Sequence, residues 1–124
     1  MQPTDFSDFL LVTGNVAFLA GLVLMALLSA TAGQSVPHRT AVPMQWGLNG
    51  KPAWMLRRRW ALLWAPACAA VFGLLLTMLA YWKAVPLSQA SVNIALARAA
   101  MAVVFVFAHI IHLGMVLAWF KNRR

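Results

Sequence analysis

Two histidines three residues apart, His109 and His112, are the side chains of this chain best suited to chemistry. Residues three or four apart share one face of a helix, so both imidazoles are expected to face a bundle interior or a partner. Cys68 and Met25, on two other predicted helices, fall at a depth similar to that of His112. Imidazole, thiolate and thioether groups are ligands for haem, copper or another soft metal. One interpretation is therefore a cofactor site at His109 and His112, with Met25, Cys68 and His112 as metal ligands.

A structural interpretation of the same residues requires no cofactor. A neutral histidine inside a bundle can donate its N–H to a carbonyl or hydroxyl group of a neighbouring helix. Methionine and cysteine are also ordinary apolar fillers. We therefore expect no bound cofactor and a histidine pair that serves packing or faces a partner, with a proton relay or pH sensor as a third alternative.

A second group of polar residues lies close to the opposite end of the predicted helices. Arg98 and Asn15 lie at similar depth in two apolar runs, and Asp8 precedes Asn15 by about two turns. Charged groups are costly in hydrocarbon and need a partner or a route to the surface. The sequence predicts a hydrogen-bonded cluster of Asp8, Asn15 and Arg98, with snorkelling of Arg98 as the alternative.

The elements that position these side chains are apolar runs of membrane-spanning length. The chain is 63% hydrophobic and 10% charged, and a helix of about 20 apolar residues crosses the hydrocarbon core. Segments that cross the lipid are expected to be helices, because a helix satisfies the hydrogen bonds of its own backbone N–H and C=O groups. We predict an all-α integral membrane protein, a single domain over residues 1–124 with three transmembrane helices in a small bundle. The spans are expected at about 9–30, 60–80 and 92–120, with an interfacial loop at 31–59.

Basic residues are concentrated on one side of these spans. The net charge is +8, and five of the basic residues lie in the loop between the first two spans: Arg39, Lys51, Arg57, Arg58 and Arg59. Loops rich in lysine and arginine remain cytoplasmic, which predicts a multi-pass protein of the bacterial inner membrane with its N-terminus outside and its C-terminus in the cytoplasm. The charge therefore indicates topology rather than nucleic-acid binding. Arg57, Arg58 and Arg59 are expected to contact anionic lipid headgroups.

Small residues at four-residue spacing suggest close helix packing. Ala65, Ala69 and Gly73 form such a face on the second span, and Ala17 with Gly21 forms one on the first. Pro66 is expected close to the start of the second helix, where a missing N–H costs least.

The loop between the first two spans carries a turn motif. Asn49 and Gly50 tolerate positive φ, Pro43 and Pro52 fix φ on either side, and Trp46 can lie in the headgroup layer. Three prolines exclude a long helix here and favour extended or turn conformations.

The order Pro43, Gln45-Trp46, Asn49-Gly50, Lys51-Pro52 and then Arg57 or Arg58 resembles the signature loop of a bacterial family of short membrane domains of unknown function. That family is found at the amino end of SdpI-type toxin-immunity proteins. The resemblance covers roughly residues 10–80. It implies a membrane protein with a role in immunity or signalling and implies no known catalysis.

Enzymatic readings receive little support from the residue types. The two carboxylates of the chain both lie near its amino end, and neither a Ser-His-Asp arrangement nor a phosphate-binding glycine loop is present. We predict a non-enzymatic membrane protein that acts through interaction with another membrane protein or with itself, including immunity or signalling. The alternative is a small electron-transfer or cofactor-holding subunit, with haem or copper at His109 and His112.

Overall fold

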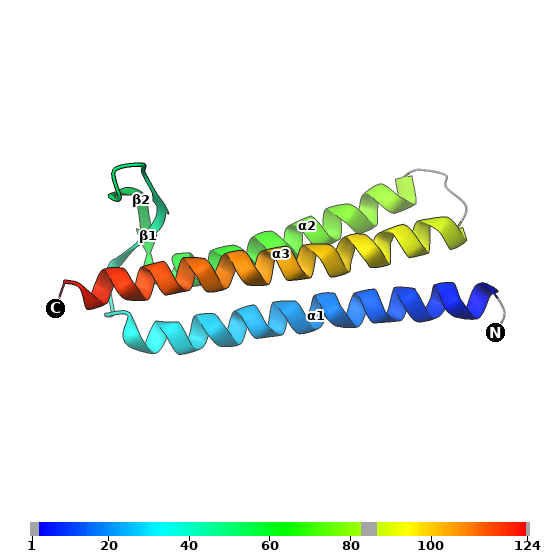
Figure 1. The fold of residues 1–124 in the computed structure, drawn as a ribbon, viewed down its shortest axis with the longest axis horizontal. Helices are drawn as coiled ribbons and strands as arrows, with labels where there is room; N and C mark the ends of the chain where they lie inside the picture. Colours follow the sequence, from blue (N-terminus) through cyan, green and yellow to red (C-terminus); the bar gives the residue numbers. More distant parts are fainter. Residues whose placement is uncertain (1–2, 83–86, 124) are drawn as a thin grey trace.

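Three long helices run side by side and form the body of the molecule (Figure 1). The computed structural model describes residues 3–82 and 87–123. The helices are α1 (Pro3–Ser35), α2 (Arg58–Trp82) and α3 (Leu87–Lys121), and the most extensive contact is between α1 and α3. Each helix contains a segment long and apolar enough to cross a membrane: Asp8–Ser35, Arg58–Leu79 and Val92–Lys121. The predicted three-helix membrane bundle is confirmed.

The helices extend beyond the apolar runs from which they were predicted. α1 continues five residues past position 30 and ends at Ser35, because adding residues to an existing helix costs little. Pro37 disfavours helical geometry in the residue that precedes it and so ends α1. α3 likewise begins at Leu87, ahead of the expected start at 92.

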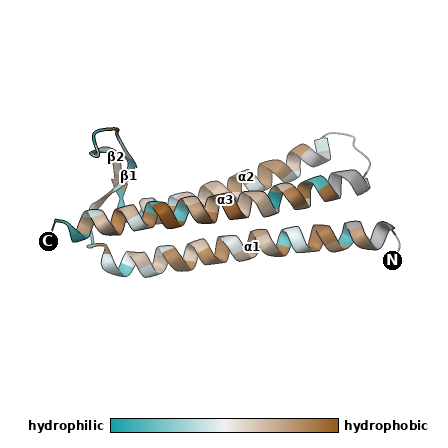
Figure 2. Ribbon diagram, in the orientation of Figure 1, coloured by the Kyte–Doolittle hydropathy of each residue, from teal (hydrophilic) through white to brown (hydrophobic). Residues whose placement is uncertain are grey.

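The surface of the bundle is apolar, as expected where lipid is the solvent. Large side chains such as Leu27, Leu74 and Val104 are more than 60% exposed. Figure 2 shows mostly hydrophobic residues along the three helices, single hydrophilic ones on α1 and α3, and hydrophilic residues at the hairpin and the C-terminal end. The lysines and arginines of the 31–59 loop, with Lys121 and Arg123, are thus at one end of the bundle and Asp8 is at the other. Arg124 lies outside the described residues.

The 31–59 loop is an antiparallel hairpin rather than an irregular connection. β1 (Ala41–Trp46) pairs with β2 (Pro52–Arg57), with irregular register around Gln45. Proline is tolerated in such a two-stranded sheet because both strands are edges. The expected extended and turn conformations are present. The all-α prediction holds for the membrane part, and the loop adds this small sheet.

The hairpin packs against the bundle. Val42 of β1 forms a buried cluster with Val36, Ala61 of α2 and Val116 of α3. Met44, Trp46, Leu56, Leu117 and Phe120 pack around that cluster. The hairpin is therefore held at a fixed place at the ends of α2 and α3, where it can shape the adjacent grooves.

Small residues are used for contacts inside the bundle. A Cβ placed on Gly14 would lie 2.6 Å from the Cα of Ala95, and one on Gly21 would lie 3.2 Å from the Cβ of Ala102. Gly73 faces the ring of Phe18 on α1 with no room for a Cβ. The predicted small-residue faces at Gly21 and Gly73 are thus covered within the chain, which leaves other surfaces for a partner.

Candidate functional site

His109 connects two helices through a buried hydrogen-bonded chain. Its side chain is 1% exposed, and its Nε2 lies 2.9 Å from the hydroxyl of Ser29 and 3.2 Å from the carbonyl oxygen of Met25. Ser29 donates its single hydroxyl hydrogen to the carbonyl oxygen of Leu62 at 2.6 Å. Ser29 therefore accepts from His109, so Nε2 carries the imidazole proton. We call His109, Ser29 and the Leu62 carbonyl the polar relay.

Pro66 explains why the relay ends at Leu62. An α-helical carbonyl accepts from the N–H four residues later, and Pro66 has no N–H to give to Leu62. Sequence reasoning placed Pro66 close to the helix start, but it lies inside α2. The hydroxyl of Ser29 satisfies the carbonyl that the proline leaves free. Ser29 was not predicted from the sequence. The available signal was Pro66 within one apolar run and the hydroxyl of Ser29 within another.

The second nitrogen of His109 is the chemically available atom of the relay. In the neutral tautomer set by Ser29, Nδ1 is a lone-pair acceptor, and it is buried without a hydrogen-bond partner among residues 3–82 and 87–123. His109 also lines a groove of about 360 Å³ between α2, α3 and the hairpin. The groove is lined by Met44, Trp54, Ala61, Trp64, Ala65, Cys68, Phe72, Phe105, Ala108, His109 and His112.

The structure brings some of the predicted metal ligands together and separates one. Cys68 and His112 line the same groove, whereas Met25 is buried in α1 and does not line it. The ring of His112 also packs against the edge of Trp46, with centroids 5.9 Å apart. Within residues 3–82 and 87–123, no group of three or more histidine, cysteine or acidic side chains could hold a metal ion. A metal site at Met25, Cys68 and His112 stays a prediction, with Cys68 and His112 in one groove and Met25 outside its lining.

Arg98 joins all three helices near the opposite end of the bundle. Its guanidinium donates to the side-chain oxygens of Asn15 on α1 and Thr77 on α2. Thr77 in turn donates to the carbonyl of Gly73 at 3.0 Å. The predicted contact between Arg98 and Asn15 is present, and Thr77 was missed because nothing in the sequence gives the rotation of α2. The predicted role of Asp8 is wrong: its side chain is exposed and makes no ion pair with Arg98.

Arg98 opens onto a groove of about 380 Å³ on the bundle surface. The groove is lined by Asn15, Phe18, Leu19, Gly73, Leu74, Thr77 and Arg98. The Nε of Arg98 is buried and has no hydrogen-bond partner in the described part of the chain. The groups that hold the guanidinium in the described structure, Asn15 and Thr77, are both neutral.

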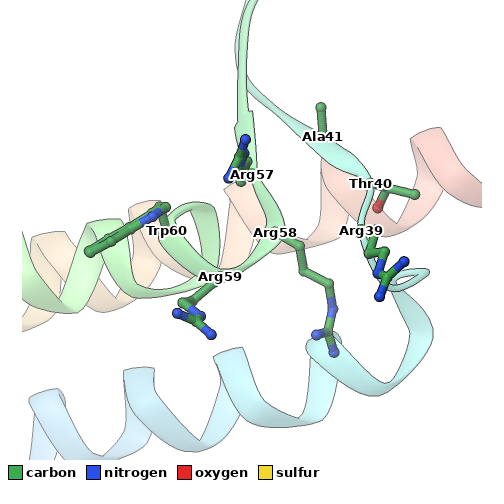
Figure 3. A pocket seen from close by; sticks show the side chains of 7 residues that line it. All are labelled: Arg39, Thr40, Ala41, Arg57, Arg58, Arg59 and Trp60. Atoms are coloured by element: carbon green, nitrogen blue, oxygen red, sulfur yellow. The ribbon is translucent and has the colours of Figure 1, made fainter.

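A basic pocket of about 730 Å³ lies where the hairpin meets α2 (Figure 3). It is lined by Arg39, Thr40, Ala41, Arg57, Arg58, Arg59 and Trp60. Arg58 extends to the last turn of α1, where it donates to the carbonyl of Gly33 and approaches Nδ1 of His38 at 3.4 Å. This guanidinium caps the α1 C-terminus, so Arg58 has a structural task beside the predicted headgroup contact. Arg57 and Arg59 remain exposed.

The residues predicted to form the loop structure lie together in the hairpin. Pro43 is buried, and Trp46 pairs with Pro52 across the strands. The turn is closed by the N–H of Gly47, which donates to the carbonyl of Lys51 at 2.8 Å. The side chain of Asn49 accepts from the N–H of Lys51, and Gly50 has φ of 70°. The expected turn at Asn49-Gly50 is thus present.

Comparisons of this chain with family models, with curated proteins and with solved structures give no match. The resemblance of the hairpin sequence to the SdpI-associated domain family therefore stays a prediction, and the geometry of the three sites carries the functional argument.

Proposed function

We propose that this protein is a small, non-enzymatic subunit of the bacterial inner membrane that binds another membrane protein at the groove around Arg98. The observation that carries the proposal is an intramembrane guanidinium without a counter-charge. Arg98 lies inside the Val92–Lys121 span, and its partners among the described residues are the neutral side chains of Asn15 and Thr77. Ionisable residues in a membrane span mark functional sites by default.

Among the described side chains of this protein, no acid pairs with Arg98. Its two carboxylates are Asp5 and Asp8. Helical rise is 1.5 Å per residue, so Asp8 lies about 10 Å along α1 from Asn15, and Asp5 lies farther. A second copy that runs parallel would bring its Asp8 only to the end of its Asp8–Ser35 span, the same distance of about 10 Å along the axis from Asn15. Charge complementarity thus favours a different protein whose transmembrane helix carries an aspartate or glutamate.

The groove has the form that such a helix requires. Phe18, Leu19, Gly73 and Leu74 form its apolar walls, and Arg98, held by Asn15 and Thr77, supplies a charged anchor among them. A charge-assisted hydrogen bond between guanidinium and carboxylate is strong and directional. This hydrogen bond is stronger inside the membrane than in water, because the local dielectric constant is low.

The charge distribution supports an orientation for this interaction. With the hairpin and C-terminal basic residues in the cytoplasm, the N-terminus lies outside. Arg98 then occupies the half of the membrane nearer the cell exterior. The resemblance of the hairpin loop to SdpI-type immunity proteins supports a partner that is a membrane-active toxin or a signalling protein.

The test is photo-crosslinking in living cells from a groove position. A crosslinking amino acid at Leu74, which lines the groove and is 62% exposed, is expected to capture one membrane protein. The matched control is Leu96, which is 61% exposed and does not line the groove. The adduct is expected to disappear in Arg98→Gln and to persist in Arg98→Lys. An adduct that is unchanged in Arg98→Gln, or equal from Leu96, would contradict the proposal.

A second candidate function is the electron-transfer or cofactor-holding subunit. The observation in its favour is the Nδ1 of buried His109, which has no partner in the part of the chain that the structure describes and lies in a groove shared with Cys68 and His112. The test is a visible spectrum with metal analysis of protein purified from native membranes. A haem band or stoichiometric copper that disappears in His109→Ala would support it. A colourless, metal-free protein would exclude it.

A further inference from the structure

The basic pocket at the start of α2 concentrates positive charge that the chain does not neutralise. Four arginines line it, namely Arg39, Arg57, Arg58 and Arg59. The side-chain carboxylates of the sequence are Asp5 and Asp8, and α1 begins at the opposite end of the bundle (Figure 1). The pocket therefore requires anions from its surroundings.

The N-terminus of α2, which lies at the pocket, adds to its positive charge. The N-terminus of an α-helix carries a partial positive charge and unpaired N–H groups, which favour anions. α2 begins at Arg58 with no acidic residue in its first turn. The pocket thus combines a helix N-terminus with guanidinium groups from three chain segments, the α1–β1 turn, β2 and α2.

Arg39 is held in this pocket at a conformational cost. Its φ is 61°, in the left-handed region that L-residues with a side chain avoid. Glycine would adopt this conformation without strain. An arginine at such a position is explained if its side chain is needed where the backbone directs it.

Arg58 positions the pocket and retains a free donor. Its two terminal nitrogens bond the carbonyl of Gly33 and the ring of His38, which holds the end of α1 against the start of α2. Its Nε is buried without a partner among the described residues. Arg58 is therefore held between the end of α1 and the start of α2, whereas the side chains of Arg57 and Arg59 are exposed.

The depth of the pocket indicates the source of the anion. The Arg58–Leu79 membrane segment begins at this pocket. Trp60 lines the pocket and is 60% exposed, as is typical of tryptophans at the headgroup layer. We infer that the pocket binds the phosphate group of one anionic phospholipid, with Arg39 and Arg59 as its principal ligands and Arg58 as a positioning residue.

The test is native mass spectrometry of the full-length protein from nanodiscs that contain equal amounts of phosphatidylglycerol and phosphatidylcholine. The wild type is expected to retain one phosphatidylglycerol, and Arg39→Gly and Arg59→Gln are each expected to lower that retention about tenfold. Arg39→Lys is expected to keep most of it. Lys51→Gln removes a positive charge at the exposed hairpin tip and is the matched control, with unchanged retention expected.

The same variants separate a ligand site from a structural or diffuse role. Arg39→Gly removes the positive-φ strain, so its melting temperature in phosphatidylcholine is expected to stay equal or rise while lipid retention falls. An equal loss of lipid retention in Lys51→Gln and Arg39→Gly would contradict a specific site. It would show that the overall positive charge of the protein attracts the anionic lipid. Stabilisation of the protein in phosphatidylcholine by inorganic phosphate, dependent on Arg39, would overturn the lipid as the source of the anion.

Discussion

Ser29 on α1 donates its hydroxyl hydrogen to the carbonyl oxygen of Leu62 on α2 at 2.6 Å. Pro66 leaves this carbonyl without its helical partner. The same hydroxyl accepts from His109 on α3, so one serine satisfies polar groups of two other helices. His109 is thereby explained as a structural residue through Nε2, and only its Nδ1 remains for other chemistry.

The polar relay predicts a cost for losing the serine hydroxyl. Ser29→Ala leaves the Leu62 carbonyl without its donor and leaves the His109 N–H with the Met25 carbonyl as its remaining acceptor. We expect the free energy of unfolding to fall by about 1–2 kcal/mol, measured by denaturation in detergent. Thr31→Ala is the control, because Thr31 bonds the carbonyl of Leu27 within its own helix at an exposed position. An equal loss in the two variants would contradict the relay.

Pro66 offers a double-mutant cycle on the same contact. In Pro66→Ala the new N–H can bond the Leu62 carbonyl inside α2, so the carbonyl no longer depends on Ser29. Ser29→Ala is therefore expected to cost less in the Pro66→Ala background than in the wild type. Additive costs in denaturation experiments would show that the two residues do not share this carbonyl.

Close approach of α1 and α3 predicts a steep penalty at one glycine. A Cβ on Gly14 would meet backbone atoms of Ala95, with 2.6 Å to its Cα. Backbone cannot move aside as a side chain can, so Gly14→Ala is expected to destabilise the bundle by about 1–3 kcal/mol. Gly114→Ala is the matched control, because nothing lies within 4 Å of its added Cβ. Thermal unfolding in the same detergent compares the two.

The hairpin is predicted to depend on its aromatic contacts. His112 packs edge-on against Trp46 of β1, so His112→Ala is expected to increase amide hydrogen exchange in β1 and β2 while α1 stays protected. His112→Phe keeps an aromatic ring and is expected to retain protection. Loss of protection in both variants would show that an aromatic ring at position 112 is not sufficient to stabilise the hairpin.

Orientation is testable with single cysteines. In a Cys68→Ala background, Lys51→Cys is expected to react with an impermeant maleimide only after the inner membrane is opened. Asp8→Cys is expected to react while that membrane is intact, because the basic end remains in the cytoplasm. The reverse pattern of labelling would overturn the orientation proposed from the charges.

The membrane part of the fold was predictable because a long apolar run in lipid has few alternatives to a helix. The turn at Asn49-Gly50 was also predictable, since positive φ has a clear residue signature. The contact of Arg98 with Thr77 was not, because the rotation of α2 depends on packing against two other helices. Asp8 was placed with Arg98 by polarity alone, although about two turns of helix separate it from Asn15.

The arrangement of the basic pocket was also not predictable from the sequence. Arg57, Arg58 and Arg59 were recognisable as a run of charge, but their separate tasks were not. Arg58 reaches back to cap α1, a contact that depends on how the hairpin returns the chain. Arg39 itself adopts the left-handed conformation in the turn before β1. No sequence pattern predicts this conformation for an arginine.

The most direct test of the proposed interaction measures whether Arg98 receives a carboxylate from another helix. A polyleucine transmembrane peptide with one aspartate at the depth of Arg98, and a twin with asparagine, can be titrated against the protein in vesicles by energy transfer. We expect the aspartate peptide to bind the wild type and Arg98→Lys about tenfold more tightly than the asparagine peptide, and this preference to vanish in Arg98→Gln. Equal binding of the two peptides to the wild type would contradict the proposed function.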